Sequence, residues 1–282
     1  MKLPEDFKIG LTLSGGASYG MAHVGVIKAL REYGIEPDIL YGTSAGAIVA
    51  SLYSGGASIR DMRKFIQGNK ILSMRRLRLP KLGFIPLTYL ENRLDDFISY
   101  ECLEDLPRKT LIGVTNLETG QHETLEKGLL SKAVAASCAI PVFFRPIELN
   151  GNLYVDGGVS NNMPAVALRQ HCDFIIGCDV VEAKRVDRKY INGFKRLLER
   201  TLTISLANRT VINYKDCDFV IRPVGMYRYA KFDFSRSDQF INYGYDQTLI
   251  DLPKILEGIR QRIMEKNDGQ VAEQRVEDEV IS

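Results

Sequence analysis

The chain has 282 residues, of which 45% are hydrophobic and 26% are charged, enough for one large globular domain with a substantial core. Its 37 Lys and Arg residues nearly balance 35 Asp and Glu residues, and the formal net charge of +2 argues against a nucleic-acid partner. Five cysteines without a C-x-x-C pair argue against a disulfide framework and a zinc site, and no run of about 18 apolar residues could span a membrane. We therefore expect a cytoplasmic protein without a metal or other cofactor.

The N-terminus contains Glu5 and Asp6 and lacks the apolar stretch of a signal peptide. Beyond it, strand and helix patterns alternate. Strands are predicted at residues 9–13, 39–41, 110–115, 142–149, 153–155, 173–179 and 218–223. Helices are predicted at residues 21–33, from 45 onward, and at 58–67, 87–98, 130–137, 164–170 and 194–209. This alternation predicts a three-layer α/β/α sandwich with a mostly parallel central sheet, formed by one domain over residues 1–263 and followed by a mobile polar tail at 264–282.

A glycine-flanked serine lies between the strand at 39–41 and the helix that follows it. The local sequence is Gly42-Thr43-Ser44-Ala45-Gly46. A serine on such a tight strand-to-helix turn adopts a strained backbone, and the two glycines leave room for the neighbouring chain. The turn directs the hydroxyl into a cleft near the positive end of the next helix. The pattern predicts a nucleophile elbow and acyl transfer through a serine ester at Ser44, with a plain Gly-rich turn as the alternative.

A second small-residue loop follows the first predicted strand and opens the first predicted helix. Its sequence is Ser14-Gly15-Gly16-Ala17-Ser18-Tyr19-Gly20. Consecutive small residues let several backbone N–H groups converge on one point, so Gly15, Gly16 and Ala17 are the candidate donors of an oxyanion hole. A nucleotide-phosphate loop is disfavoured, because neither the G-x-x-x-x-G-K-[ST] spacing nor the G-x-G-x-x-G spacing is present.

The chain has only three histidines, and none is a persuasive general base. His23 lies within the first predicted helix, His122 follows a hairpin-like turn, and His171 lies near a predicted helix end. Asp156 is the better candidate, because it ends a short predicted strand before a Gly-rich turn, although Asp-Gly also occurs in ordinary hairpins. A free aspartate has a pKa of about 3.9, so Asp156 must be partly desolvated and within hydrogen-bond reach of Ser44 to accept its proton.

Four motifs resemble, in this order, those of the patatin-like phospholipase family, in particular its small bacterial single-domain members. They are the strand, loop and helix within residues 10–26, the elbow at 42–46, the segment at 136–146 and the Asp-Gly-Gly motif at 156–158. The likeness covers roughly residues 8–180. It implies a patatin-like fold and a Ser44–Asp156 dyad that cleaves fatty-acyl esters of phospholipids or lysophospholipids, with the oxyanion held by the amides of Gly15, Gly16 and Ala17.

The sequence departs from the family pattern at two positions of the oxyanion loop. Ala17 and Tyr19 stand where the family usually has a glycine and an Arg or Lys. An alanine costs about 1 kcal/mol where φ must be positive, and Tyr19 removes a fixed positive charge. These departures support an alternative function, a catalytically weak lipid-binding or regulatory protein on the same scaffold. A lipid acyltransferase, which would share every site residue, is a third hypothesis.

Residues 70–86 combine five cations with many apolar side chains and contain no acid. Such a segment suits a cap that makes peripheral contact with an anionic membrane surface, but a solvated loop whose apolar side chains close the core explains it as well. The basic run at 184–189 is interpreted as a solvated connection, and the aromatic-rich stretch at 227–245 as core packing or a subunit contact. The sequence does not determine the acyl length, the headgroup or the oligomeric state.

Overall fold

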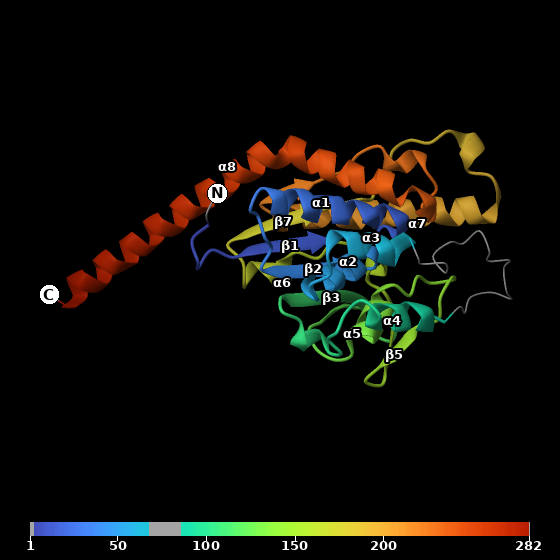
Figure 1. Ribbon diagram of the computed structural model, residues 1–282, viewed down its shortest axis with the longest axis horizontal. Coiled ribbons are helices and arrows are strands. Elements are labelled where there is room, and N and C mark those ends of the chain that lie inside the picture. Colours follow the sequence, from blue (N-terminus) through green and yellow to red (C-terminus); the bar gives the residue numbers. More distant parts are fainter. Residues whose placement is uncertain (1–2, 68–85, 282) are drawn as a thin grey trace.

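The computed structural model describes residues 3–67 and 86–281, so the basic segment at 70–86 lies outside the described residues except for Pro86. An eight-stranded sheet forms the centre of the protein (Figure 1). Its strands are β1 (Ile9–Leu13), β2 (Ile39–Thr43), β3 (Lys109–Asn116), β4 (His122–Leu125), β5 (Ile147–Leu149), β6 (Asn152–Asp156), β7 (Phe174–Cys178) and β8 (Phe219–Ile221). They are ordered β5-β6-β3-β2-β1-β7-β8, with β4 also paired to β3. Neighbouring strands in the series β3-β2-β1-β7-β8 are parallel, which confirms the predicted mostly parallel sheet.

Helices cover both faces of this sheet. They are α1 (Ala22–Glu32), α2 (Ala45–Ser54), α3 (Ile59–Gln67), α4 (Thr88–Asp95), α5 (Leu130–Ser137), α6 (Val166–Arg169), α7 (Gly193–Ile212) and α8 (Ser237–Ile281). Along β1, the side chains of Ile9, Leu11 and Leu13 belong to the larger hydrophobic cluster, with side chains of α1, α2 and α8. The intervening Gly10 and Thr12 face the α6 side. Because alternate strand residues point to opposite faces, one strand contributes to both cores, and the predicted three-layer α/β/α sandwich is confirmed.

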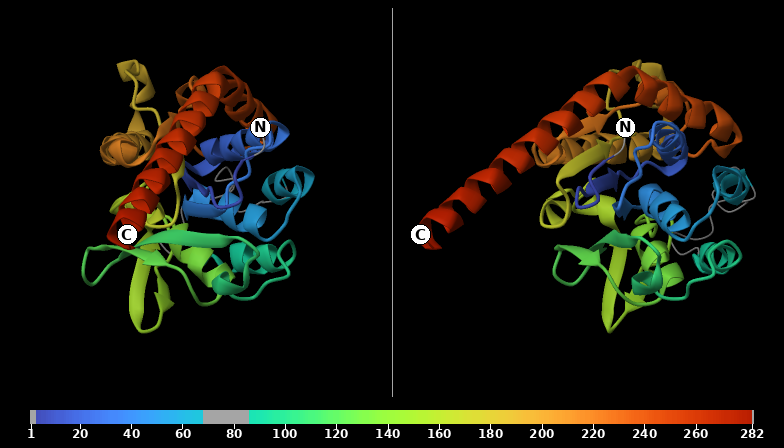
Figure 2. Two further views of the ribbon diagram at one scale, coloured as in Figure 1. Left: turned by 90° about the vertical axis from the view of Figure 1, so that its left-hand side faces the viewer. Right: turned by 60° about the vertical axis from the view of Figure 1, so that its left-hand side comes forward.

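Helix α8 packs along α1 and then extends beyond the body of the protein (Figures 1 and 2). A Cβ atom on Gly25 would overlap the carbonyl oxygen of Ile241, and one on Gly244 would overlap that of Ala22. Glycine at both crossing points therefore lets the two helix backbones come into direct contact. Phe240 on α8 is fully buried, as expected for core packing of the aromatic-rich stretch.

The C-terminal residues 264–281, treated above as a polar tail, continue α8. Within residues 3–67 and 86–281, no helix combines the length and the hydropathy that crossing a bilayer requires.

One predicted strand is shorter in the structure. The strand expected at residues 142–149 forms only at Ile147–Leu149, because residues 140–144 form a turn, in which the N–H groups of Phe143 and Phe144 donate to the carbonyl of Ile140 and Val142 has a φ of +76°. His122 begins β4, directly after the hairpin-like turn that the sequence predicts before it. The side chain of Asn116 stabilises this turn, because it accepts hydrogen bonds from the two backbone N–H groups at positions 118 and 119.

Candidate active site

Ser44 lies on the sharp turn between β2 and α2, with a φ of +53° and a ψ of −120°. This backbone conformation is strained for a residue that carries a side chain. A Cβ atom on Gly42 would overlap the backbone of Ala47, and one on Gly46 would overlap the carbonyl group of Leu13. Both glycines therefore allow a tight turn against α2 and β1, and the elbow has the geometry that the sequence predicts.

The register of β3 brings Asp156 next to this turn. Strand β4 pairs with residues of β3 that also pair with β2 or with β6. Since a strand has only two edges, β2 and β6 must both lie on the edge of β3 opposite β4. At that edge Thr43 pairs with Gly113, and Asp156 pairs with the next residue, Val114. Ser44 and Asp156 are 112 residues apart in the sequence, yet they meet where these two strands end.

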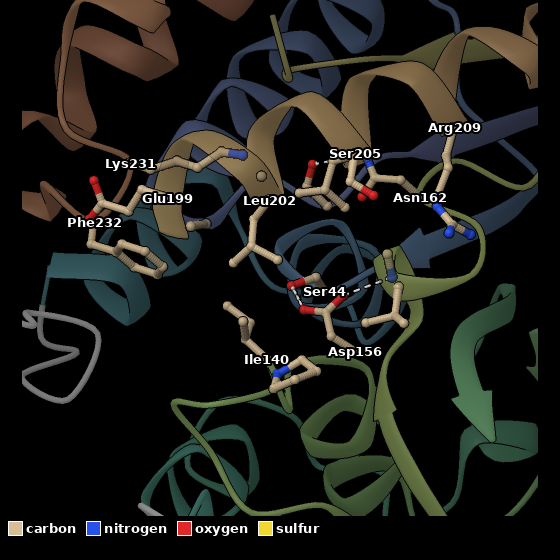
Figure 3. Close-up of a pocket in the computed structure, with 17 residues that line it drawn as sticks. Ser44, Ile140, Asp156, Asn162, Glu199, Leu202, Ser205, Arg209, Lys231 and Phe232 are labelled. Atoms are coloured by element: carbon tan, nitrogen blue, oxygen red, sulfur yellow. Dashed lines mark hydrogen bonds between the residues drawn. The ribbon is translucent and has the colours of Figure 1, made fainter. Parts of the chain in front are cut away.

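The side chains of Ser44 and Asp156 form a direct, buried pair (Figure 3). The Ser44 hydroxyl donates a hydrogen bond of 2.6 Å to Oδ2 of Asp156, and the backbone N–H of Gly158 donates one of 2.8 Å to Oδ1. Burial raises the pKa of Asp156 to about 6, and the two hydrogen bonds limit the rise. The carboxylate is therefore still ionised at neutral pH and is a stronger base than an exposed aspartate.

None of the three histidines lines the cavity at Ser44. His23 is buried in α1, where its Nε2 atom lies 2.8 Å from the carbonyl oxygen of Ser14, and burial lowers the pKa of His23 to about 4. Nε2 of His122 lies 2.9 Å from the hydroxyl of Tyr41. His171 lies at the surface after α6. All three are in structural positions, and the serine–aspartate pair contains no imidazole.

The loop after β1 faces the same cavity as Ser44. The N–H of Gly15, expected among the oxyanion donors, already donates a hydrogen bond of 3.2 Å to the carbonyl oxygen of Asn162. The N–H groups of Gly16 and Ala17 have no acceptor in the part of the chain that the structure describes. Ala17 has a φ of +53°, so the alanine carries the backbone strain considered above. This arrangement leaves Gly16 and Ala17 as free donors and gives Gly15 a role in fixing the loop.

A cavity of about 200 Å³ extends from this pair to α7. Apolar side chains form much of its wall, among them Ile140, Leu202, Leu206 and Phe232. Figure 3 shows Leu202 directed from α7 toward Ser44, with Ile140 on the other side. Helix α7 and Lys231 are parts of this wall that the sequence does not indicate, because both follow the recognised motifs and have no motif of their own.

Ser137, at the end of α5, holds the elbow in place. Its Oγ accepts a hydrogen bond of 2.8 Å from the N–H of Ser44 and donates one of 2.6 Å to the carbonyl of Gly113, and both are buried. Ser137→Ala removes these hydrogen bonds from two buried backbone groups. We expect the free energy of unfolding, measured by urea denaturation, to fall by about 2–4 kcal/mol, since each such group costs roughly 1–3 kcal/mol.

Ser51→Ala is the matched control for this prediction. The Ser51 hydroxyl is also buried, on α2, but it has no hydrogen-bond partner in the described part of the chain. We expect removal of this hydroxyl to lower the free energy of unfolding by less than about 0.5 kcal/mol, or to raise it. Equal losses in the two variants would show that packing, and not the hydrogen bonds of Ser137, stabilises this region.

Comparison with known proteins gives matches in sequence. A family model described as "Patatin-like phospholipase" matches residues 11–169. An "Uncharacterized NTE family protein" of Mycobacterium tuberculosis is 32% identical over 163 residues, which cover 56% of this chain and 44% of that protein. A "Lysophospholipase NTE1" of Kluyveromyces lactis is 30% identical over 213 residues, which cover 68% of this chain and 14% of that protein. The chain thus spans less than half the length of these curated relatives.

Two solved structures are similar in fold. VipD from Legionella pneumophila has a TM-score of 0.48 at 18% identity, covering 90% of this chain and 67% of that chain. ExoU in its complex with SpcU, from Pseudomonas aeruginosa, has a TM-score of 0.46 at 16% identity, covering 97% of this chain and 60% of that chain.

Proposed function

The chain belongs to the patatin-like phospholipase family, and we propose that it hydrolyses fatty-acyl esters of phospholipids or lysophospholipids through a Ser44–Asp156 dyad. The observation that carries this proposal is the hydrogen bond of 2.6 Å from Ser44 Oγ to Asp156 Oδ2, on a strained elbow that opens into a largely apolar cavity. The name "Lysophospholipase" of the Kluyveromyces lactis relative supports a lipid ester as the substrate.

In the proposed mechanism Asp156 accepts the proton of Ser44 while Oγ attacks the acyl carbonyl carbon. The N–H groups of Gly16 and Ala17 stabilise the oxyanion of the tetrahedral intermediate, and each such donor contributes about 2.7–4 kcal/mol. The ester C–O bond then breaks, and the leaving alcohol takes the proton from Asp156. Water next gives a proton to Asp156 and attacks the acyl-serine, and the fatty acid departs as Ser44 regains its proton.

Covalent labelling with a fluorophosphonate probe tests whether the dyad is active. We expect a single adduct on Ser44, identified by peptide mass spectrometry, and slower labelling below about pH 6, where Asp156 is protonated. An inert lipid-binding protein would bind lipid vesicles and remain unlabelled. An acyltransferase would be labelled but would pass the acyl group to an alcohol, so release of free fatty acid as the main product identifies hydrolysis.

Helix α7, which forms one wall of the cavity, also presents an apolar stripe to the outside. Phe194, Leu197, Ile204 and Val211 recur at helical spacing and are 68%, 55%, 40% and 53% exposed. Figure 2 shows this helix at the periphery of the protein. Arg196 lies beside the stripe on the same helix and is exposed. We propose that this face of α7 contacts an anionic lipid surface, because a row of exposed apolar side chains with Arg196 beside it matches its chemistry.

The double variant Phe194→Ser, Leu197→Ser is expected to bind anionic vesicles about tenfold more weakly, because it removes two apolar side chains that would enter the lipid. Co-sedimentation with vesicles of phosphatidylglycerol and phosphatidylcholine measures this binding. Ile250→Ser is the matched control, since Ile250 is 70% exposed on α8. Unchanged binding would contradict the lipid contact. A dimeric native protein that the double variant converts to a monomer would assign the stripe to a contact between copies instead.

A further inference from the structure

A second cavity, of about 500 Å³, adjoins the cavity at Ser44. Its walls come from α7, from the segment at 182–191 and from the segment at 227–231. Glu199 and Lys231 line both cavities. A group bound in the second cavity would therefore lie next to an ester bound at Ser44.

Positive charge exceeds negative charge in the second cavity. The basic side chains that line it are Arg185, Arg196, Arg200, Arg228 and Lys231, and the acidic ones are Glu182, Asp187 and Glu199. Glu182 already pairs with Lys184 at 2.7 Å. Asp187 pairs with Lys189 at 3.4 Å, and Glu199 pairs with Arg196 at 3.9 Å. The four remaining basic side chains have no ion-pair partner among the described residues, so the cavity favours an anion.

Lys231 is the most unusual of these cations because it is buried, with only 8% of its surface exposed. Its Nζ atom donates a hydrogen bond of 3.1 Å to Oγ1 of Thr203, and no carboxylate in the described ranges forms an ion pair with it. Burial lowers the pKa of Lys231 to about 8, so the ammonium keeps its charge at neutral pH. The carboxylates of Asp179, Asp156 and Glu199 act on this ammonium from beyond ion-pair distance. A buried ammonium without a direct ion-pair partner is costly, so it marks a place where an anionic ligand can bind.

The backbone of Lys231 is fixed to the loop after β1. Its carbonyl oxygen accepts hydrogen bonds from the N–H of Ser18 at 3.0 Å and from the Ser18 hydroxyl at 2.9 Å. In Figure 3 the Lys231 side chain runs along one wall of the cavity toward α7. A ligand held by Lys231 would thus have a defined position relative to the loop that carries Gly16 and Ala17.

We propose that the second cavity binds the phosphate group of a lipid headgroup while the acyl ester lies at Ser44. Phosphate oxygens can accept hydrogen bonds from the ammonium of Lys231 and from the guanidinium groups of Arg200 and Arg228, whose planar donors match phosphate geometry. The phosphate would supply the direct ion-pair partner that Lys231 lacks among the described residues. This inference rests on the proposed hydrolysis, and it makes phosphate-bearing lipids, in preference to neutral glycerides, the substrate class.

Two esters with the same acyl chain test the proposal: 1-dodecanoylglycerol 3-phosphate and 1-dodecanoylglycerol, both used as monomers. We expect the native protein to prefer the phosphate ester at least about tenfold in kcat/KM and Arg200→Gln to lower this ratio about tenfold, as for the loss of one charge-assisted hydrogen bond. Arg260→Gln, which changes an exposed residue of α8 outside the cavity, is expected to keep the ratio. Arg228→Gln gives a second measurement from a surface position, so the test does not depend on altering buried Lys231.

Calorimetry on the Ser44→Ala variant separates this proposal from the proposed hydrolysis. Binding of 1-dodecanoylglycerol 3-phosphate that weakens with Arg200→Gln supports the phosphate site even if the native protein hydrolyses neither ester, a result that would contradict the hydrolase. Hydrolysis of both esters at equal rates would overturn the phosphate site and leave the hydrolase standing. Inorganic phosphate that binds as tightly as the phosphate ester would assign the cavity to free phosphate and overturn the headgroup assignment.

Discussion

Replacing Ser44 with alanine is expected to lower kcat/KM for a p-nitrophenyl acyl ester by at least about 10⁴-fold, the scale on which nucleophile substitutions act in serine hydrolases. Oγ is the atom that bonds to the acyl carbon, and without it Asp156 has no proton to accept. The backbone strain at Ser44 is the same for alanine, because both residues carry a Cβ atom at a φ of +53°. The variant is therefore expected to fold, which circular dichroism checks.

Ser51→Ala serves as the activity control as well, because Ser51 is buried on α2 but does not line the cavity. It is expected to keep the native kcat/KM. Normal hydrolysis by Ser44→Ala would falsify the dyad mechanism. Loss of activity in both variants would point to a general disturbance of α2 instead of loss of the nucleophile.

The parts of the site that the sequence predicts are those with a local physical cause. The elbow at Ser44 follows from two glycines that a tight turn requires, and these glycines do lie against Ala47 and Leu13 in the structure. Asp156 is a candidate base because a strand ends at an Asp-Gly-Gly turn, and in the structure the N–H of Gly158 in that turn donates to the carboxylate. In each case the residues that impose the geometry are neighbours in the sequence.

The remaining parts depend on contacts between distant segments. The N–H of Gly15 is engaged by Asn162, which is 147 residues away, and nothing in the loop sequence indicates this partner. Lys231 is bonded through its backbone to Ser18, which is 213 residues away in the sequence. The periodicity of α7 predicts a helix, but it does not tell which face lines a cavity and which is exposed. Such features are set by packing, for which the local sequence holds no signal.

Replacing Asp156 with asparagine is expected to lower kcat/KM about 10³-fold or more, since general-base catalysis contributes up to about 10⁴-fold. An asparagine keeps an oxygen for the Gly158 N–H but cannot take the proton of Ser44. In the native protein kcat/KM is expected to fall below about pH 6, where Asp156 becomes protonated, and the residual activity of the variant should lack this fall. Asp179→Asn is the control: Asp179 is a buried carboxylate outside the cavity, so its loss should leave the fall near pH 6 in place.

The same substitution is expected to stabilise the fold at high pH. Burial raises the pKa of Asp156 from 3.8 to about 6, so the folded protein holds this proton more tightly than the unfolded chain does. The free energy of unfolding therefore decreases as the pH rises from about 4 to 6, and above that range the ionised carboxylate costs up to about 3 kcal/mol. Asp156→Asn removes this cost, so urea denaturation should show a larger gain in stability at pH 8 than at pH 4. An equal change at the two pH values would mean that the Asp156 pKa is not raised in the fold, and the carboxylate would then be too weak a base for the proposed step.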